Sequence, residues 1–229
     1  MSLIFRQWFE SESSTYTYLL ADSKTKEAII IDPVQETLDR DLTLIKEMGL
    51  KIKYTVETHI HADHVTSANK IKEKTGAQMV LGSGTQLKTA DILLKDQESI
   101  SFGEFSLKAI LTPGHTDGCT SYYIPGYVFT GDALLIRGCG RTDFQQGSSK
   151  TLFHSVREKL FSLPDETLVY PGHDYKGRTC SSIAEEKAHN PRLHLKISEA
   201  QFIEIMNNLN LDKPKKIDIA VPANLKHGH

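Results

Sequence analysis

The sequence predicts an α/β protein in which two β-sheets pack face to face and helices cover their outer faces. In the N-terminal half, short apolar strands alternate with segments of helical periodicity. In the middle of the chain, strands follow one another through short turns that contain Gly and Pro. Helical segments then return toward the C-terminus. Mixed strands with helices toward both ends of a chain are typical of two packed sheets with a helical cover.

The expected strands of the N-terminal half are short and rich in β-branched or aromatic residues. They comprise residues 5–9, 16–20, 28–31, 53–57 and 78–81. We expect two helices between them. The first covers residues 38–48 and ends at Gly49, and the second covers residues 64–74 and ends at Gly76.

The second half begins with two expected hairpins, over residues 100–110 around Gly103 and over residues 122–128 around Pro125. A helix after Ser148 should bury an apolar face formed by Leu152, Phe153, Val156, Leu160 and Phe161.

A last strand at residues 168–170 and two further helices complete the expected elements. The final helix opens with a capping box formed by Ser198 and Gln201. It should bury Phe202, Ile205, Met206 and Leu209. No linker or repeat divides the chain, so we expect a single domain over residues 1–229.

Composition limits the classes of function. The formal net charge of the 229 residues is -2, and no basic cluster suggests a nucleic-acid surface. No apolar run has the length of a membrane span, so we expect no membrane partner. The first nine residues lack the apolar core of a signal peptide, which favours the cytoplasm, or the mitochondrial matrix for a trimmed mature form. Three widely spaced cysteines argue against a disulfide framework.

The most informative segment is the turn from Thr58 to His64, which reads H-x-H-x-D-H from His59 onward. It follows an expected strand. Three imidazoles and one carboxylate on one short turn are suitable ligands for a divalent metal of borderline softness. His59 and His61 can converge on one ion, and Asp63 and His64, at the start of the expected helix, can reach a second. The segment therefore predicts a metal site.

Three later motifs place further candidate ligands after apolar runs. His115 follows Pro113-Gly114, Asp132 follows Gly131, and His173 follows Pro171-Gly172. Strand ends that deliver ligands to one edge of a sheet are a common way to build a rigid site. Each motif alone is a weak indication, but the ordered set of four is a strong one.

This ordered set closely resembles the metallo-β-lactamase superfamily. The resemblance implies a four-layer αββα sandwich, which agrees with the arrangement expected from the strands and helices. Because one site geometry serves many reactions, the metal motif alone does not identify the chemistry.

Longer stretches resemble the persulfide dioxygenases of the mitochondrial type and their bacterial relatives along essentially the whole chain. These stretches are residues 129–147, 170–175, 206–211 and 220–224. The resemblance implies an oxidoreductase of sulfide and persulfide catabolism with one Fe(II) per chain. Such an enzyme oxidises glutathione persulfide with O2 and water to sulfite and glutathione. It also implies a homodimer.

By residue matching, the resemblance implies that His59, His115 and Asp132 bind the iron and form the catalytic centre. Two imidazoles and one carboxylate are the facial triad associated with ferrous oxygenases. Such a set leaves one net positive charge on the Fe(II) site and open positions for an anionic sulfur and for dioxygen. The triad is therefore chemically suited to the implied reaction.

The other polar residues of the motifs have a different expected role. His61, Asp63, His64 and His173 would orient ligands and hold water or substrate around a single metal. The full ligand set for two metals is nevertheless present in the sequence, so a second bound metal stays open.

Arg141 and Tyr175 are the candidate substrate-binding residues. Both match positions at which related glutathione-thioester hydrolases hold glutathione, and Arg can grip a carboxylate with two hydrogen bonds. The alternative for Arg141 is an ion pair with Asp143 that stabilises its own loop. The alternative for Tyr175 is a core position.

Two other functions compete with the dioxygenase. One is a glyoxalase-II-type hydrolase that cleaves S-acylglutathione with two metals, and the other is a non-catalytic protein that binds metal and thiols. A metal count and a turnover assay distinguish the three. Cys119 and Cys139 lie near the site in sequence, and we expect each to be a small buried apolar residue rather than an oxidation-sensitive one.

Overall fold

The structure is a computed structural model that describes residues 2–85, 87, 89–213 and 216–228. The N-terminal half forms a six-stranded sheet in which the strands lie in chain order. The first three strands are antiparallel, and the next three join in parallel. These strands are β1 (Leu3–Glu10), β2 (Thr15–Asp22), β3 (Glu27–Ile31), β4 (Lys51–Val56), β5 (Gln78–Gly82) and β6 (Ile92–Leu94).

The second half forms another six-stranded sheet with the order β12-β11-β10-β9-β8-β7. Only β10 and β11 pair in parallel within it; the other neighbours are antiparallel. The expected hairpins around Gly103 and Pro125 are confirmed. The strands are β7 (Ser99–Phe102), β8 (Phe105–Leu111), β9 (Thr120–Ile124), β10 (Tyr127–Gly131), β11 (Leu168–Pro171) and β12 (Ser181–Ser182).

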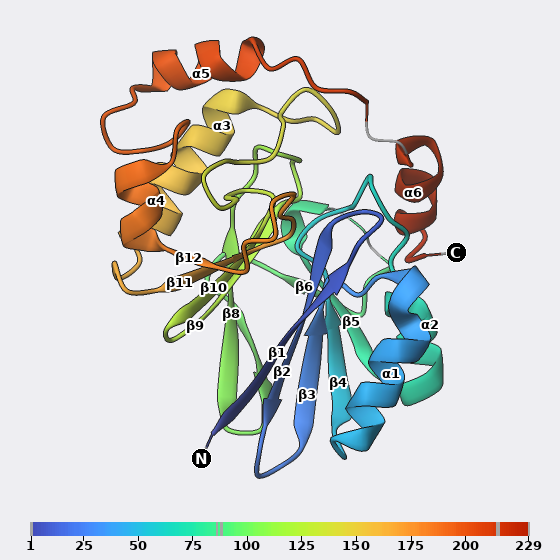
Figure 1. The fold of residues 1–229 in the computed structure, drawn as a ribbon. Helices are drawn as coiled ribbons and strands as arrows, with labels where there is room; N and C mark the ends of the chain where they lie inside the picture. The colour runs from blue at the N-terminus through green and yellow to red at the C-terminus, as the bar shows by residue number, and fades with distance from the viewer. Residues whose placement is uncertain (1, 86, 88, 214–215, 229) are drawn as a thin grey trace.

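Helices cover the outer face of each sheet (Figure 1). On the first sheet lie α1 (Leu38–Glu47) and α2 (Ala68–Thr75), and short 3-10 turns occur at Gln35–Thr37 and Ser83–Thr85. On the second lie α3 (Ser149–His154), α4 (Ile183–His189) and α5 (Glu199–Asn207). A π-helical turn (Ser155–Lys159) and a 3-10 turn (Leu160–Ser162) continue α3. The last helix, α6 (Ile217–Asn224), lies beside the first sheet.

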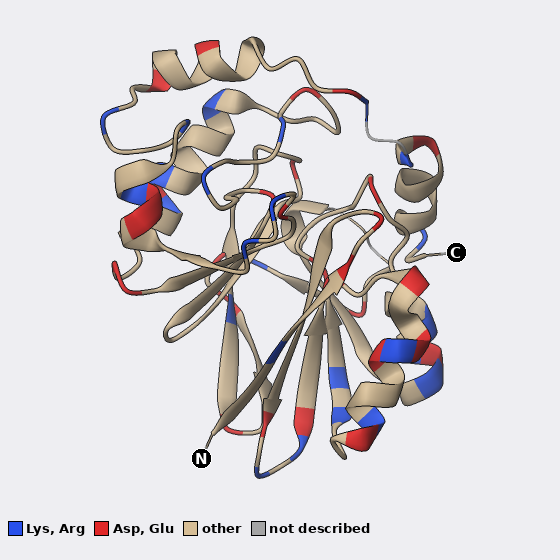
Figure 2. Ribbon diagram, viewed as in Figure 1, with Lys and Arg blue, Asp and Glu red and all other residues tan. Residues whose placement is uncertain are grey.

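Three apolar clusters hold the four layers together. The middle cluster joins the inner faces of the sheets, with Leu20 on one side and Phe129 on the other. The neighbouring residue Leu19 points outward and packs with α1 and α2, because successive side chains of a strand point to opposite faces. The third cluster joins Val128 to α3, α4 and α5. In Figure 2, Lys, Arg, Asp and Glu residues lie mainly on helices and loops, as expected for two sheets that are covered on both faces. The predicted αββα sandwich is confirmed.

One helix begins later than its sequence pattern suggests. We expected a helix from residue 64, but α2 begins at Ala68. The backbone of residues 65–67 is engaged elsewhere, because Gln35 N donates to Val65 O and Ser67 N donates to Pro33 O, each at 2.9 Å. Asp63 and His64 therefore lie on an irregular turn, not on a helix start, and that expectation was wrong.

Three elements were not expected from the sequence. Strands β6 and β12 are only three and two residues long, too short to show periodicity. Helix α6 contains Pro222 in its interior, where a missing N–H normally argues against a helix. The expectation that α5 is the final helix was therefore wrong, although its capping box is present.

Candidate metal centre

Loops that follow four strands bring the expected ligands together at one end of the sandwich. β4 leads to His59, β8 to His115, β10 directly to Asp132, and β11 to His173. Gly172 is required beside this group, because a Cβ atom there would lie 2.8 Å from Asp132 Oδ1. The strand-end pattern thus places side chains that are far apart in sequence around one point.

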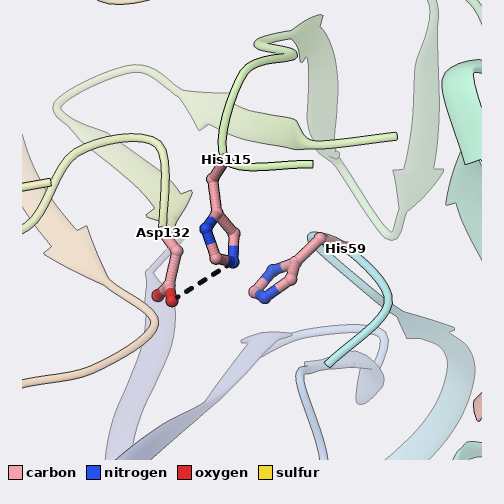
Figure 3. Close-up of side chains that lie close together, drawn as sticks. All are labelled: His59, His115 and Asp132. Carbon is pink, nitrogen blue, oxygen red and sulfur yellow. Dashed lines mark ion pairs between the residues drawn. The ribbon is translucent and has the colours of Figure 1, made fainter. Parts of the chain in front are cut away.

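His59, His115 and Asp132 form the group that the sequence predicted. Each offers one ligand atom, and the three atoms lie within 4.8 Å of one another. His115 Nε2 lies 3.6 Å from Asp132 Oδ2, and the ring of His59 faces them (Figure 3). His59 is buried, whereas the side chains of His115 and Asp132 are 11% and 12% exposed. The group is therefore partly open to solvent, as a site that admits substrate must be.

Hydrogen bonds orient the two imidazoles. Thr58 Oγ1 donates to Asp32 Oδ2 at 2.8 Å, so its oxygen accepts from His59 Nδ1 at 2.9 Å. His115 Nδ1 donates to the carbonyl of Arg141 at 2.6 Å. Because each Nδ1 carries the proton, each Nε2 presents a lone pair. Fixing the tautomer in this way is typical of metal-binding histidines.

The charges also suit a cation. Burial and the neighbouring His61 hold the pKa of His59 well below its usual value, so its imidazole is neutral. Burial raises the pKa of Asp132, but the nearby His173 outweighs burial and the net pKa lies below its usual range. Two imidazoles and one carboxylate are a donor set that fits ferrous iron.

His61 turns away from this group toward two buried carboxylates. Its Nε2 atom lies 3.2 Å from Asp32 Oδ1 and 3.5 Å from Glu57 Oε2. Burial lowers the pKa of His61, but the two carboxylates outweigh burial and raise it to about 10. The two carboxylates therefore favour the protonated form of His61, in which the imidazole has no lone pair for a metal.

Asp63, His64 and His173 are joined to one another. Asp63 Oδ2 lies 2.9 Å from both His64 Nδ1 and His173 Nε2. His173 Nδ1 donates to Asp132 Oδ1 at 2.7 Å. Burial lowers the pKa of His173, but Asp132 and Asp63 raise it well above its usual value. His173 is therefore a charged donor that orients Asp132.

Arg141 is held by its own loop and by the segment after α5. Its Nε and Nη2 atoms donate to the two carboxylate oxygens of Asp143, each at 2.7 Å. Its Nη1 atom donates to the carbonyl of Asp212 at 2.6 Å. The ion pair that the sequence offered as the alternative is present. Substrate binding by Arg141 stays a prediction, and a substrate carboxylate would have to replace Asp143.

Tyr175 lies at the surface beside the site. Its side chain is 72% exposed, and its ring stacks parallel to His173 with the centroids 6.0 Å apart. The core alternative for this residue was therefore wrong. Cys119 and Cys139 are buried free thiols, and burial raises their pKa to about 12 and about 11, respectively. Both cysteines match their expected role as small buried residues.

The sequence did not indicate the residue that holds the histidine turn from outside. Asn224, at the end of α6, is 2% exposed. Its Nδ2 atom donates to the carbonyls of His61 and His64 at 2.9 and 2.8 Å, and its Oδ1 atom accepts from Thr66 N at 2.9 Å. The only indication in the sequence was that Asn224 lies in one of the stretches that resemble the dioxygenases.

An αββα sandwich that carries an H-x-H-x-D-H turn at its strand ends defines a class of metal-dependent protein. A family model described as the metallo-beta-lactamase superfamily matches residues 11–173. The mouse protein Persulfide dioxygenase ETHE1, mitochondrial, is 53% identical over 99% of this chain and 89% of its own length. Its human counterpart is 52% identical with the same coverage.

A solved structure shows the same relationship. The crystal structure of ETHE1 from Myxococcus xanthus has a TM-score of 0.96 and 52% identity, covering 99% of this chain and 100% of that chain. The chain therefore belongs to the persulfide dioxygenase family of the metallo-β-lactamase superfamily.

Proposed function

We propose that the protein is a mononuclear iron(II) enzyme that oxidises glutathione persulfide with O2 and water to sulfite and glutathione. Persulfide dioxygenase activity, and hence a role in sulfur metabolism, follows from its family. The details that we propose beyond the family's activity are that the metal is Fe(II), that each chain binds one metal ion, and that glutathione carries the persulfide. The observation that carries them is that His59, His115 and Asp132 each offer one ligand atom and that these atoms lie within 4.8 Å of one another, as a set of two imidazoles and one carboxylate.

The state of the other ligands supports one metal. His61 faces Asp32 and Glu57. Asp63, His64 and His173 are hydrogen-bonded as a set. A two-metal hydrolase would need these four side chains as ligands, and a second metal would have to break the hydrogen bonds between Asp63 and the two imidazoles of His64 and His173.

Each residue has a defined task in the proposed reaction. His59, His115 and Asp132 would hold the ferrous ion, which supplies the redox chemistry between persulfide and dioxygen. Thr58 and the carbonyl of Arg141 fix the two imidazoles. His173 fixes the carboxylate by donating from Nδ1. The partly exposed side of the triad would admit an anionic sulfur beside the bound ion, where proximity would favour reaction.

The remaining assignments concern substrate and setting. We propose that Arg141 and Tyr175 bind the glutathione part of the substrate, that residues 1–229 act as one domain, and that two copies form a dimer. Among the described residues, no helix is long and apolar enough to cross a membrane. A cytoplasmic location is proposed, with the mitochondrial matrix as the alternative; the names of the mouse and human relatives describe them as mitochondrial.

Oxygen uptake by iron-loaded protein tests the proposal. Uptake should begin only when glutathione persulfide is added, and sulfite should form in proportion. Metal analysis of protein purified without oxygen should give one iron per chain. The zinc-loaded protein with S-lactoylglutathione is the control. Fast oxygen-independent cleavage of this thioester, without persulfide-dependent oxygen uptake, would favour the hydrolase instead. Binding of metal and persulfide without turnover would favour the non-catalytic alternative.

A further inference from the structure

The hydroxyl group of Thr15 lies among the three side chains that could hold a second metal. Thr15 Oγ1 lies 3.0 Å from Asp63 Oδ2, 3.1 Å from His173 Nε2 and 3.3 Å from His64 Nδ1. Thr15 is fully buried. One hydroxyl thus contacts every member of the Asp63, His64 and His173 set.

The backbone fixes the position of this hydroxyl. Thr15 is the first residue of β2 in the first sheet, and it forms an antiparallel bridge with His173, which follows β11 in the second sheet. Tyr16 N donates to Gly172 O at 2.8 Å beside this bridge. Ser14 has a φ of 60°, so the chain turns sharply just before Thr15. A β-branched side chain on such a backbone has few rotamers. The pairing between the two sheets therefore fixes the backbone that carries the hydroxyl, and the side chain has few other rotamers to adopt.

Binding of a second cation would compete directly with this arrangement. A zinc or iron ion needs nitrogen and carboxylate ligands at about 2.0–2.2 Å. The Oδ2 atom of Asp63 and the Nε2 atom of His173 instead contact each other at 2.9 Å and contact the Thr15 hydroxyl. A cation would have to break these hydrogen bonds, and the hydroxyl that makes them is anchored in the sheet.

We propose that Thr15 sets the metal stoichiometry at one per chain by holding Asp63, His64 and His173 in a hydrogen-bonded set. Thr15 is a positioning residue in this role. In this role, Thr15 would favour the one-metal site of a dioxygenase over the two-metal site of a hydrolase. The inference rests on the proposed one-metal function.

The test is a zinc titration of metal-free protein, which requires no turnover. Wild type, Thr15→Ser and Thr15→Ala are dialysed against graded Zn(II), and bound zinc per chain is measured. Wild type and Thr15→Ser, which keeps the hydroxyl, should bind one equivalent. Thr15→Ala should bind a second equivalent, with a dissociation constant at least tenfold lower than that of any weak second binding to wild type. The double variant Thr15→Ala with Asp63→Ala should lose that second equivalent.

The outcomes separate the two proposals. Two tightly bound equivalents in wild type would overturn the one-metal function, and the inference with it. One equivalent in wild type and in folded Thr15→Ala would overturn only the role of Thr15. Thermal unfolding checks that each variant folds. If Thr15→Ala does not fold, Thr15→Val replaces it, because valine keeps the shape of the side chain without the hydroxyl and should also gain the second equivalent.

Discussion

Replacement of His173 by alanine should weaken iron binding without abolishing it. The change removes the 2.7 Å hydrogen bond from His173 Nδ1 to Asp132 Oδ1 but leaves all three proposed ligands in place. A hydrogen bond to a charged group contributes about 1.5–3 kcal/mol, and each 1.4 kcal/mol is about a tenfold change in an equilibrium constant. The affinity for Fe(II) should therefore fall about 10- to 100-fold. His115→Ala removes a ligand and should lose most of its iron.

The assay is anaerobic competition for Fe(II) against chelators of graded affinity, with apparent dissociation constants compared among variants. His154→Ala is the matched control, because His154 is 41% exposed and forms ion pairs with the carboxylates of Glu158 and Glu199. It should bind iron as wild type does. Equal loss of iron from His173→Ala and His115→Ala would mean that His173 is a ligand, and the one-metal assignment would be refuted.

Three further predictions concern stability, substrate and pH. Asn224→Ala removes three buried hydrogen bonds to residues 61–66 and should lower the free energy of unfolding by about 2–4 kcal/mol in chemical denaturation. Asn208→Ala, at the exposed C-cap of α5, should change it by less than about 1 kcal/mol. Arg141→Ala should lower kcat/KM for glutathione persulfide about 10- to 100-fold, because KM rises, while the iron content stays unchanged. An unaltered kcat/KM would mean that Arg141 only stabilises its loop. His61 has a folded pKa of about 10, above its usual value of about 6.5. Its stabilising contribution should therefore be complete below about pH 6.5 and disappear as the pH rises through about 10. The stability difference between metal-free wild type and His61→Gln should accordingly shrink across that range, and a difference that grows with pH would contradict this reasoning.

The sequence alone predicted the sandwich and, through its resemblance to a known family, the group of His59, His115 and Asp132 that the structure brings together. Strand and helix periodicity are local properties, so most elements could be located before the fold was known. The H-x-H-x-D-H turn and the strand-end positions of His115 and Asp132 are also local patterns. Strand ends meet at a sheet edge, which is why such positions could be predicted to converge.

Only the tertiary structure decided which polar side chains of the pattern lie close to one another. His61 and His59 are alike in sequence, but Asp32, which follows a different strand, and Glu57 attract His61 away. The sequence around Thr15 and Asn224 does not itself indicate a role in the site. Each nevertheless contacts the site from a distant part of the chain. Short strands and a helix with an interior proline were missed for the same reason. Their stability comes from contacts made across the fold, and a periodic pattern in one segment carries no information about those partners.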